Sequence, residues 1–496
     1  MKNPAFIFRY LNLWFFSISI LVSCNSNKIN PPDPYPPLPS AAQLQWHKME
    51  YYGFLHFGLN TFTGQEWGYG DISPEEFNPT DFNADQIVGT ASAAGMKGLI
   101  LTCKHHDGFC LWPSKFTDYS VKSSPWKDGK GDVVKEISEA CTKYGLKFGV
   151  YLSPWDRNHP DYGKPEYIEY YRNQLRELLS NYGPVFEVWF DGANGGNGWY
   201  GGADEERKID RSTYYDWENT WKIVRELQPD AVIFSDVGPD VRWVGNENGI
   251  AGDPCWATYT PVTTDSSNPT PGNVKYQLGQ NGTRNGEFWM PAECDVSIRP
   301  GWFYHEDQDS LVKLPKYLLD LYFKSVGRGA SLLLNIPPDK RGRITKADSS
   351  NLIEFKLLRD QVFKTNLAQK AKLTASNVRG ELDEYSPLNL VIDDPEKYWS
   401  TDDIIHEPEL LLEFENMVVF NVISLQEYLP LGQRIDRWAI DIWENDQWIQ
   451  VAEGTSIGNK RLWKGKPQTT NKVRLRVIES PVSPAISKIG LFLEKP

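Results

Sequence analysis

Carboxylates and imidazoles follow apolar runs in this sequence, at positions where they could perform acid–base chemistry. The run 185–190 ends in Asp191-Gly192, and the run 98–103 ends in Lys104-His105-His106-Asp107. An apolar run without helical periodicity is typical of a buried strand. The carboxyl end of such a strand is where a (β/α)8 barrel carries its catalytic groups. A lone aspartate of this kind more often only caps a turn, but two such strand ends predict one shared pocket.

Five clusters of carboxylates, histidines and aromatic residues fall at or just beyond predicted strand ends. Such a mixture is typical of a site for a neutral sugar, because carboxylates can act as acid, base or nucleophile while imidazoles bind hydroxyls and aromatic rings stack on the sugar. Any single histidine or tryptophan is better explained as a core residue, but five clusters together favour a site. No metal-ligand spacing accompanies them, so neither a metal nor another cofactor is expected. The clusters are His56 with Glu66-Trp67, His105-His106, Tyr151 to Trp155, Asp191, and Asp236 with Trp243 to Glu247.

Composition narrows the class of partner. The chain has 19 Trp, 24 Tyr and 23 Phe, an excess that suits sugar binding, although well-filled cores would also explain it. Its net charge is −13, and no basic run follows the first few residues. These features argue against nucleic acid and against an anionic membrane surface as partners.

Residues 1–24 are predicted to be a lipoprotein signal peptide. Lys2 and Arg9 precede an apolar segment, Tyr10–Val22, that is too short for a comfortable membrane span. The following Leu-Val-Ser-Cys24 resembles a bacterial lipobox, in which Cys24 is acylated after cleavage, and a plain secretory signal is the alternative. The proline-rich residues 25–40 are predicted to be a stiff, extended linker. We therefore expect an exported protein, periplasmic or at the cell surface, that meets a bacterial membrane only through a lipid anchor at Cys24.

Alternating strands and helices over residues 41–362 predict a (β/α)8-like TIM barrel. Only seven strands can be identified, so an eighth, short strand is expected near Thr258–Pro271. A doubly wound open sheet is the structural alternative, but the chain lacks its Gly-x-Gly-x-x-Gly motif. The predicted strands cover residues 53–59, 98–103, 147–153, 185–190, 231–236, 288–298 and 331–336, and the predicted helices cover 85–94, 133–144, 165–180, 214–227 and 314–325.

Residues 371–496 follow a different pattern and are predicted to form an all-β sandwich. Their segments are short, alternate between apolar and polar residues, and are separated by turn residues. The tryptophans of this region mostly fall within alternating patterns, where burial in a core is expected. Only Tyr398-Trp399 looks placed on an exposed loop. The sandwich is therefore expected to stabilise the barrel first and to bind sugar second.

Long motifs along the predicted barrel resemble glycoside hydrolase family 29, the α-L-fucosidases. They occur in the family's order across essentially the whole barrel. Arg242–Glu247 and Ser297–Tyr304 also resemble the subfamily selective for α-1,3/1,4-linked fucose. In the C-terminal region, residues 391–394, 398–403 and 431–434 are similar to a discoidin-like (factor 5/8 type C) domain. The barrel motifs are Tyr52–Gly58, Lys104–Phe109, Val188–Gly192, Gly245–Glu247, Met290–Tyr304 and Leu332–Pro338.

The resemblance implies a retaining exo-α-L-fucosidase that acts on fucosylated oligosaccharides or glycoconjugates. Asp191 matches the family's nucleophile, and Glu247 matches the acid/base of this subfamily. Glu66 lies at a position where some family members have a rival acid/base candidate. The residues that match positions around the fucose ring are His56, Trp67, His105, His106, Tyr151 and Trp302.

Other carboxylates and other functions stay open at this point. Asp236 and Glu293 are rival carboxylates, and Glu293, inside an apolar run, is expected to brace Arg299 or the histidines. An α-L-galactosidase of the same fold is one alternative function, and an apolar wall near C6 of the sugar, with Trp302 or a phenylalanine, would argue against it. A non-catalytic surface glycan-binding protein is the other, although the presence of both Asp191 and Glu247 argues against that.

Overall fold

The computed structural model describes Met1 and residues 29–195, 197–200, 202, 204–265 and 267–495. Cys24 and the rest of the predicted signal peptide after Met1 lie outside the described residues. The chain divides into two units, residues 1–31 and residues 32–496, and the second contains both predicted folded regions. Within the described residues, no helix combines the length and the apolar character that crossing a membrane requires.

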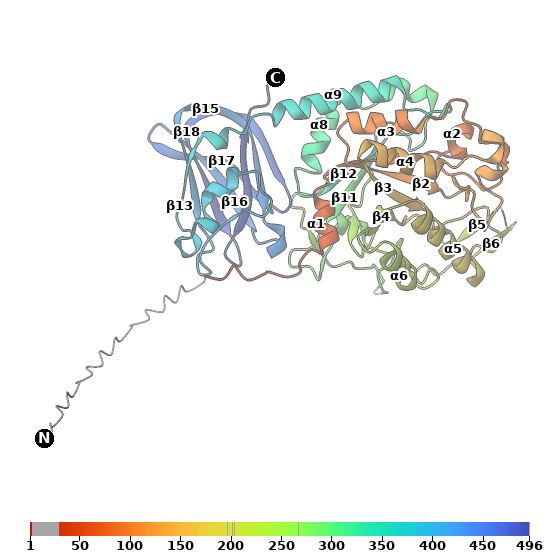
Figure 1. Ribbon diagram of the computed structural model, residues 1–496, viewed down its shortest axis with the longest axis horizontal. Coiled ribbons are helices and arrows are strands. Elements are labelled where there is room, and N and C mark those ends of the chain that lie inside the picture. Colours follow the sequence, from red (N-terminus) through yellow and green to blue (C-terminus); the bar gives the residue numbers. More distant parts are fainter. Residues whose placement is uncertain (2–28, 196, 201, 203, 266, 496) are drawn as a thin grey trace. The chain divides into compact units, whose positions relative to one another are not determined.

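Eight parallel strands close a barrel, which confirms the predicted fold class (Figure 1). The strands β1, β2, β7, β11 and β12 are buried along their whole length. Both faces of a parallel strand are covered, which explains why their sequences are apolar without alternation. Around the barrel the order is β1 (Tyr51–Leu55), β12 (Ser331–Asn335), β11 (Ala292–Ser297), β8 (Val241–Trp243), β7 (Val232–Ser235), β4 (Val185–Trp189), β3 (Lys147–Leu152) and β2 (Gly98–Lys104).

The eighth strand lies elsewhere than the sequence indicated. Strand β8 follows β7 directly after residues 236–240, and Phe234 pairs with Val241 in parallel. The region 258–271 instead contributes β9 (Thr258–Tyr259), which pairs with β10 (Phe288–Trp289) in a small antiparallel sheet outside the barrel. The prediction was wrong because a three-residue strand is too short to leave a periodic pattern.

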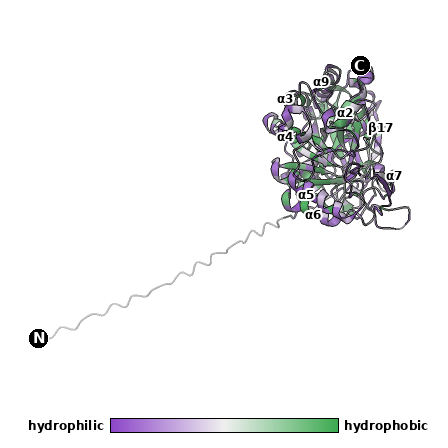
Figure 2. Cartoon of the chain, turned by 90° about the vertical axis from the view of Figure 1, so that its right-hand side faces the viewer, coloured by the Kyte–Doolittle hydropathy of each residue, from purple (hydrophilic) through white to green (hydrophobic). Residues whose placement is uncertain are grey.

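Helices surround the barrel, and the five predicted ones begin and end within three residues of their predicted positions, whereas the helices over residues 41–47, 59–63, 276–281 and 346–362 were not predicted. Asn83 and Asp132 cap α3 and α4 by accepting hydrogen bonds from backbone N–H groups three residues on. Gly145 ends α4 with a φ of 70°, a conformation that favours glycine. Apolar segments gather in the interior and hydrophilic ones at the periphery (Figure 2). The helices are α1 (Ala41–His47), α2 (Leu59–Thr63), α3 (Ala84–Ala93), α4 (Val133–Tyr144), α5 (Pro165–Asn181), α6 (Trp217–Leu227), α7 (Tyr276–Asn281), α8 (Pro315–Lys324) and α9 (Lys346–Val362).

The C-terminal region is an antiparallel β domain built on a seven-stranded sheet. Trp399 and Trp438 are buried in its core. Tyr398 is buried too, since its ring stacks on Tyr428 at 4.3 Å between centroids. The expectation that Tyr398-Trp399 forms an exposed aromatic pair was therefore wrong. The strands are β13 (Lys372–Ala375), β14 (Trp399–Ser400), β15 (Glu409–Glu427), β16 (Arg437–Glu444), β17 (Gln447–Thr455), β18 (Arg461–Glu479) and β19 (Ala485–Phe492).

Residues 32–40, which belong to the predicted stiff, extended linker, pack against the folded body. The Tyr35 N–H donates to the Leu431 carbonyl at 2.9 Å, and Arg434 Nη1 donates to the Asp33 carbonyl at 2.8 Å. An extended proline-rich segment makes no internal hydrogen bonds, so its carbonyl groups are free to accept from a neighbour. This part of the linker is therefore held against the C-terminal domain.

Candidate active site

A pocket of about 550 Å³ is lined by residues of the barrel strands and of the loops that follow their carboxyl ends. This volume suits a small ligand such as a sugar. All nine residues that the sequence placed in the site line it: His56, Glu66, Trp67, His105, His106, Tyr151, Asp191, Glu247 and Trp302.

Asp191 lies just past the end of β4, and three groups surround its carboxylate. Tyr151 Oη donates to Oδ2 at 2.8 Å, and the Ala193 N–H donates to Oδ1 at 2.7 Å. His106 Nε2 is 3.6 Å from Oδ2. Burial raises the pKa of Asp191 to about 7, while the two hydrogen bonds oppose this shift by favouring the ionised form. The carboxylate is thus held in one orientation and titrates near neutrality.

The partners of His56 determine which of its ring nitrogens carries the proton. Asn335 Nδ2 donates to the Trp302 carbonyl at 2.7 Å, so its Oδ1 must be the atom that accepts from His56 Nδ1 at 2.9 Å. Burial lowers the pKa of His56 to about 3, so the ring is neutral. Its Nε2 is left as a hydrogen-bond acceptor for a hydroxyl group.

His105 and His106 are also neutral, and their partners differ. Ser153 Oγ donates to the Trp155 carbonyl and therefore accepts from His106 Nδ1, both at 2.7 Å. His106 Nε2 is consequently an acceptor, and burial lowers the pKa of this ring to about 3. His105 Nδ1 instead faces Asn60 Nδ2 at 3.5 Å, a donor, which leaves the Nε2 proton of His105 free to be donated. The three imidazoles thus offer both acceptors and a donor to hydroxyl groups.

Glu247 lies in the loop after β8, and neighbouring residues determine the course of that loop. Gly245 has a φ of +84°, and a Cβ there would approach the Tyr276 carbonyl oxygen to 2.3 Å, so only glycine fits. The Asn246 side chain accepts from the Asn248 N–H and donates to the Ile250 carbonyl. Trp302 Nε1 donates to Glu247 Oε2 at 3.2 Å. The carboxylate is exposed, and it is oriented by the indole.

Glu66 joins two loops at the rim of the pocket. Its Oε2 accepts from the Trp302 N–H at 2.9 Å, and its Oε1 lies 2.7 Å from His305 Nε2. Both carboxylate oxygens are therefore engaged by the loop that carries Trp302. This arrangement makes Glu66 a residue that positions Trp302.

The two rival carboxylates, Asp236 and Glu293, lie in different places. Asp236 lines the pocket and accepts from the Gly272 N–H at 2.8 Å, and burial raises its pKa to about 6. Glu293 lies inside the barrel, where it accepts from Trp189 Nε1 at 2.7 Å and from the Tyr52 hydroxyl. The expectation that Glu293 braces Arg299 or the histidines was wrong, because its side chain points into the barrel interior toward Glu187.

Several lining residues were not found from the sequence. Asp295 accepts from Trp243 Nε1 at 2.7 Å and lies near Glu247. Arg211 follows the insertion after Asp191, and its Nη2 donates to the Gly195 carbonyl at 2.7 Å. Phe54 and Trp189 form an apolar wall with Trp302. Asp295 lies within an apolar run, whereas Arg211 lies far from any strand end and leaves no sequence signal. Within the described part of the chain, no group of three or more His, Cys, Asp and Glu side chains is arranged to hold a metal ion.

Comparison with known proteins identifies the family. The model of the alpha-L-fucosidase family matches residues 39–355. Alpha-L-fucosidase 1 of Arabidopsis thaliana is 43% identical over 495 residues, which cover 98% of this chain and 94% of the plant protein. The chain belongs to the alpha-L-fucosidase family. It is thus a glycoside hydrolase with α-L-fucosidase activity, and not a non-catalytic glycan-binding barrel.

Solved structures of this family share the fold over most of the chain. A glycoside hydrolase 29 family member from an unknown rumen bacterium is 43% identical with a TM-score of 0.82, and the match covers 94% of this chain and 78% of that one. A GH29 fucosidase of Ruminococcus gnavus in complex with fucose is 35% identical with a TM-score of 0.83, covering 95% and 98%. The similarity therefore includes the C-terminal β domain as well as the barrel.

Proposed function

We propose that this α-L-fucosidase is a retaining exo-enzyme in which Asp191 is the nucleophile and Glu247 the general acid/base. The observation that carries the proposal is that two carboxylates line one pocket: Asp191 is fixed by hydrogen bonds from Tyr151 and Ala193, and Glu247 is exposed on a loop. A retaining glycosidase needs two carboxyl groups flanking the glycosidic bond, one as nucleophile and one as acid. Fucose bound in the Ruminococcus gnavus relative supports a fucosylated glycan as the substrate.

The reaction then takes two steps. In the first, an Asp191 oxygen attacks the anomeric carbon, the bond from that carbon to the leaving oxygen breaks, and Glu247 gives its proton to that oxygen. In the second, water attacks the same carbon, Glu247 takes a proton from the water, and the ester to Asp191 breaks to release fucose. The neutral imidazoles of His56, His105 and His106 bind sugar hydroxyls without adding charge near the nucleophile.

Two variants test these roles. Asp191→Ala is expected to abolish turnover, and azide should restore part of it by forming the inverted β-fucosyl azide. Glu247→Ala should reduce hydrolysis of natural oligosaccharides by about 10²–10⁴-fold and of activated aryl fucosides much less, since an aryl oxide leaves without a proton. Normal turnover by the Asp191 variant, or equal losses on both substrate classes by the Glu247 variant, would contradict the assignments.

Fucose fits the apolar wall of this pocket better than L-galactose does. Fucose has a methyl group where L-galactose carries a hydroxymethyl group. The rings of Phe54, Trp189 and Trp302 can pack on the methyl group, whereas the C6 hydroxyl of L-galactose would lack a hydrogen-bond partner against them. We expect kcat/KM for an aryl α-L-fucoside to exceed that for the matching α-L-galactoside by at least tenfold. Comparable values would favour the galactosidase alternative.

We further propose selectivity for α-1,3/1,4-linked fucose, on the resemblance of Arg242–Glu247 and Ser297–Tyr304 to that subfamily. Arg211 supports it by connecting two extended loops beside the pocket, since it donates to the carbonyls of Gly195 and Gly272. These loops could contact a branching galactose. Lewis-type trisaccharides should therefore be better substrates than 2′-fucosylated oligosaccharides, and similar kcat/KM values for both would refute the proposal.

Export, lipidation at Cys24 and a discoidin-like identity of the C-terminal domain are proposed on sequence resemblance alone. Cys24→Ala should move the protein from the membrane fraction to the soluble fraction without changing its kinetics. Unchanged membrane association would refute lipidation at this cysteine.

A further inference from the structure

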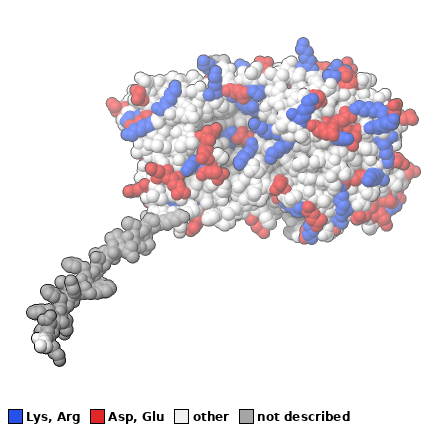
Figure 3. All heavy atoms as spheres, viewed as in Figure 1, with Lys and Arg blue, Asp and Glu red and all other residues white. Residues whose placement is uncertain are grey.

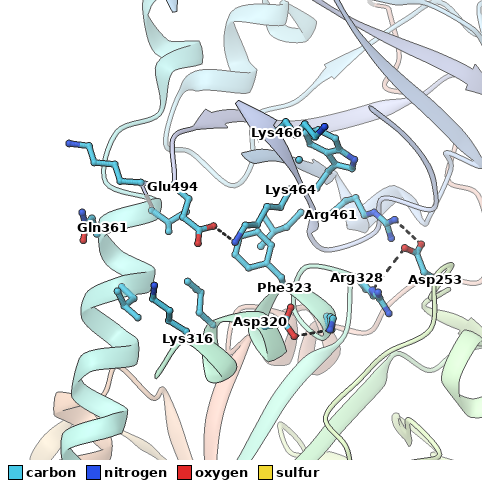
Figure 4. Close-up of a pocket in the computed structure, with 18 residues that line it drawn as sticks. Asp253, Lys316, Asp320, Phe323, Arg328, Gln361, Arg461, Lys464, Lys466 and Glu494 are labelled. Carbon is cyan, nitrogen blue, oxygen red and sulfur yellow. Dashed lines mark hydrogen bonds and ion pairs between the residues drawn. The ribbon is translucent and has the colours of Figure 1, made fainter. Parts of the chain in front are cut away.

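A second pocket, of about 910 Å³, lies where the barrel helices α8 and α9 meet strand β18 of the C-terminal domain (Figure 4). It is larger than the pocket that contains Asp191. None of the residues proposed for catalysis lines it. Its side chains come from both folded regions of the chain, for example Lys316 from α8 and Lys464 from β18.

The lining of this second pocket is strongly basic in a chain whose net charge is negative. Seven lysines and arginines line it, against three acidic residues. Over the face that Figure 3 shows as a whole, both signs of charge are interspersed. A cluster of one sign within a concave wall concentrates the electrostatic potential there. The seven are Lys316, Lys324, Arg328, Arg461, Lys464, Lys466 and Lys495.

The three acidic residues do not neutralise this charge. Asp320 pairs with Lys324, and Glu494 pairs with Lys464, at 2.7 and 2.6 Å. In the described part of the chain, Asp253 is the one carboxylate that pairs with both Arg461 and Arg328 in the pocket wall. Among the described residues, the ammonium groups of Lys316, Lys466 and Lys495 have no carboxylate partner. The exposed ion pairs are weak, so an anionic group of a ligand can displace the carboxylate from its lysine. The wall therefore has unpaired positive charge available.

Arg461 adds to this imbalance. Its side chain is only 6% exposed, and its Nη2 donates to Asp253 at 2.7 Å. Its Nε and Nη1 atoms have no hydrogen-bond partner among the described residues. A buried guanidinium that shares its single carboxylate with Arg328 leaves the wall positively charged.

Two half-buried aromatic rings complete the lining, Phe323 from α8 and Trp463 from β18. Lys464 Nζ lies 5.6 Å from the centroid of the Phe323 ring. Aromatic rings beside cations suit a ligand that has both an apolar face and negative charge. An inorganic anion has no such face and would occupy little of the volume.

We propose that this second pocket binds an acidic oligosaccharide, a glycan segment with sulfate or carboxylate groups. The anionic groups would pair with Lys316 and Lys466, and a sugar face would lie against Trp463 or Phe323. Such a site would hold an acidic glycan on the enzyme independently of the pocket that cleaves fucose. Binding at this second pocket requires neither the proposed roles of Asp191 and Glu247 nor the proposed linkage selectivity.

Calorimetric titration of the full-length protein with a heparin-derived tetrasaccharide tests the proposal. The double variant Lys316→Ala/Lys466→Ala should bind at least tenfold more weakly than the unmodified protein. The matched control, Lys370→Ala/Lys397→Ala, removes two exposed lysines outside the pocket and should bind unchanged. The kcat/KM for an aryl α-L-fucoside should be the same in all three proteins, which separates this site from the catalytic one.

Further titrations identify the ligand class. A neutral chitotetraose should bind at least tenfold more weakly than the sulfated tetrasaccharide, and sodium sulfate should compete only at much higher concentration. The tetrasaccharide should also raise the melting temperature of the unmodified protein more than that of the double variant, because the ligand contacts both folded regions. Equal binding by the double variant, an equal loss in the control, or sulfate binding as tightly as the tetrasaccharide would each overturn the proposal.

Discussion

At the scale of single residues, two opposing effects determine the pKa of Asp191. Burial raises the pKa of Asp191 toward neutrality, whereas a nucleophile must be ionised. The hydrogen bonds from Tyr151 and Ala193 favour the ionised form and also fix the orientation of the carboxylate. The neighbouring His106 is neutral, so it contributes no positive charge. Tyr151 is therefore the side chain that most directly controls the charge of Asp191.

Tyr151→Phe should move the acidic limb of the kcat/KM profile to higher pH. The lost hydrogen bond to a charged group is worth about 1.5–3 kcal/mol, which corresponds to a pKa increase of about one to two units for Asp191. The profile is measured with an aryl fucoside between pH 4 and 9. Tyr171→Phe is the control, because its buried hydroxyl donates to the Leu152 carbonyl and not to Asp191. An unchanged acidic limb in the Tyr151 variant would contradict this role.

At the scale of elements, loops that follow different strands position Glu247 together. The loop after β8 carries Glu247, the loop after β11 carries Trp302, and the loop after β1 carries Glu66. Glu66 binds the Trp302 backbone, and the Trp302 indole binds Glu247. A displacement of any of these three loops should therefore change the orientation of the Glu247 carboxylate.

Glu66→Gln should lower activity by roughly tenfold, to the same extent on aryl fucosides and on natural oligosaccharides. The amide can no longer pair with His305 as a carboxylate does, so Trp302 and Glu247 are less well oriented, but proton transfer itself is retained. The ratio of kcat/KM values on the two substrate classes is the measurement. A loss confined to poor leaving groups would instead make Glu66 the acid/base.

Gly245→Ala should cost both activity and stability. The left-handed backbone at this position costs an alanine about 1–2 kcal/mol, and the close approach to the Tyr276 carbonyl would displace the loop with Glu247. Gly183→Ala is the matched control, because Gly183 has a φ of +81° with open space around it. Both variants should melt earlier, but only Gly245→Ala should lose activity, by about 10²-fold if proton transfer fails. Equal activity in the two variants would show that the loop tolerates the displacement.

At the scale of the whole molecule, the apolar core of the barrel extends into the C-terminal domain, which also has a core of its own. Val422, Leu462 and Phe492 of the β domain belong to the same buried cluster as the barrel helices. The Phe363 and Phe492 rings meet at 5.2 Å between centroids. Burial across this interface couples the stability of the two regions.

Phe492→Ala should therefore destabilise the barrel as well as the domain that carries it. Replacing a buried phenylalanine by alanine typically costs about 3–5 kcal/mol. The temperature of half-inactivation, which reports on the barrel, should fall together with the melting midpoint seen by circular dichroism. Met417→Ala, on an exposed side chain of the same domain, should change neither. If the Phe492 variant melts early but keeps its activity to the original temperature, the two regions unfold independently.

The sequence by itself determined the barrel and nine of the residues that line its pocket. Apolar runs mark the strands, and the carboxyl ends of parallel strands meet at one edge, so Asp191 and His105-His106 could be brought together without coordinates. Glu66 and Glu247 were found in clusters beyond predicted strand ends, but their roles, and the place of Trp302 in the pocket, came from the resemblance, because loops carry no periodic pattern.

Only the tertiary structure decided the features that depend on partners distant in sequence. The protonated nitrogen of His56 follows from Asn335, and the positioning role of Glu66 follows from Trp302 and His305. Glu293 was misplaced because an apolar run does not show which of its side chains points into the barrel. The short strand β8 and the docking of residues 32–40 were missed for a related reason. Both are stabilised by hydrogen bonds to residues distant in sequence, which no local sequence pattern reveals.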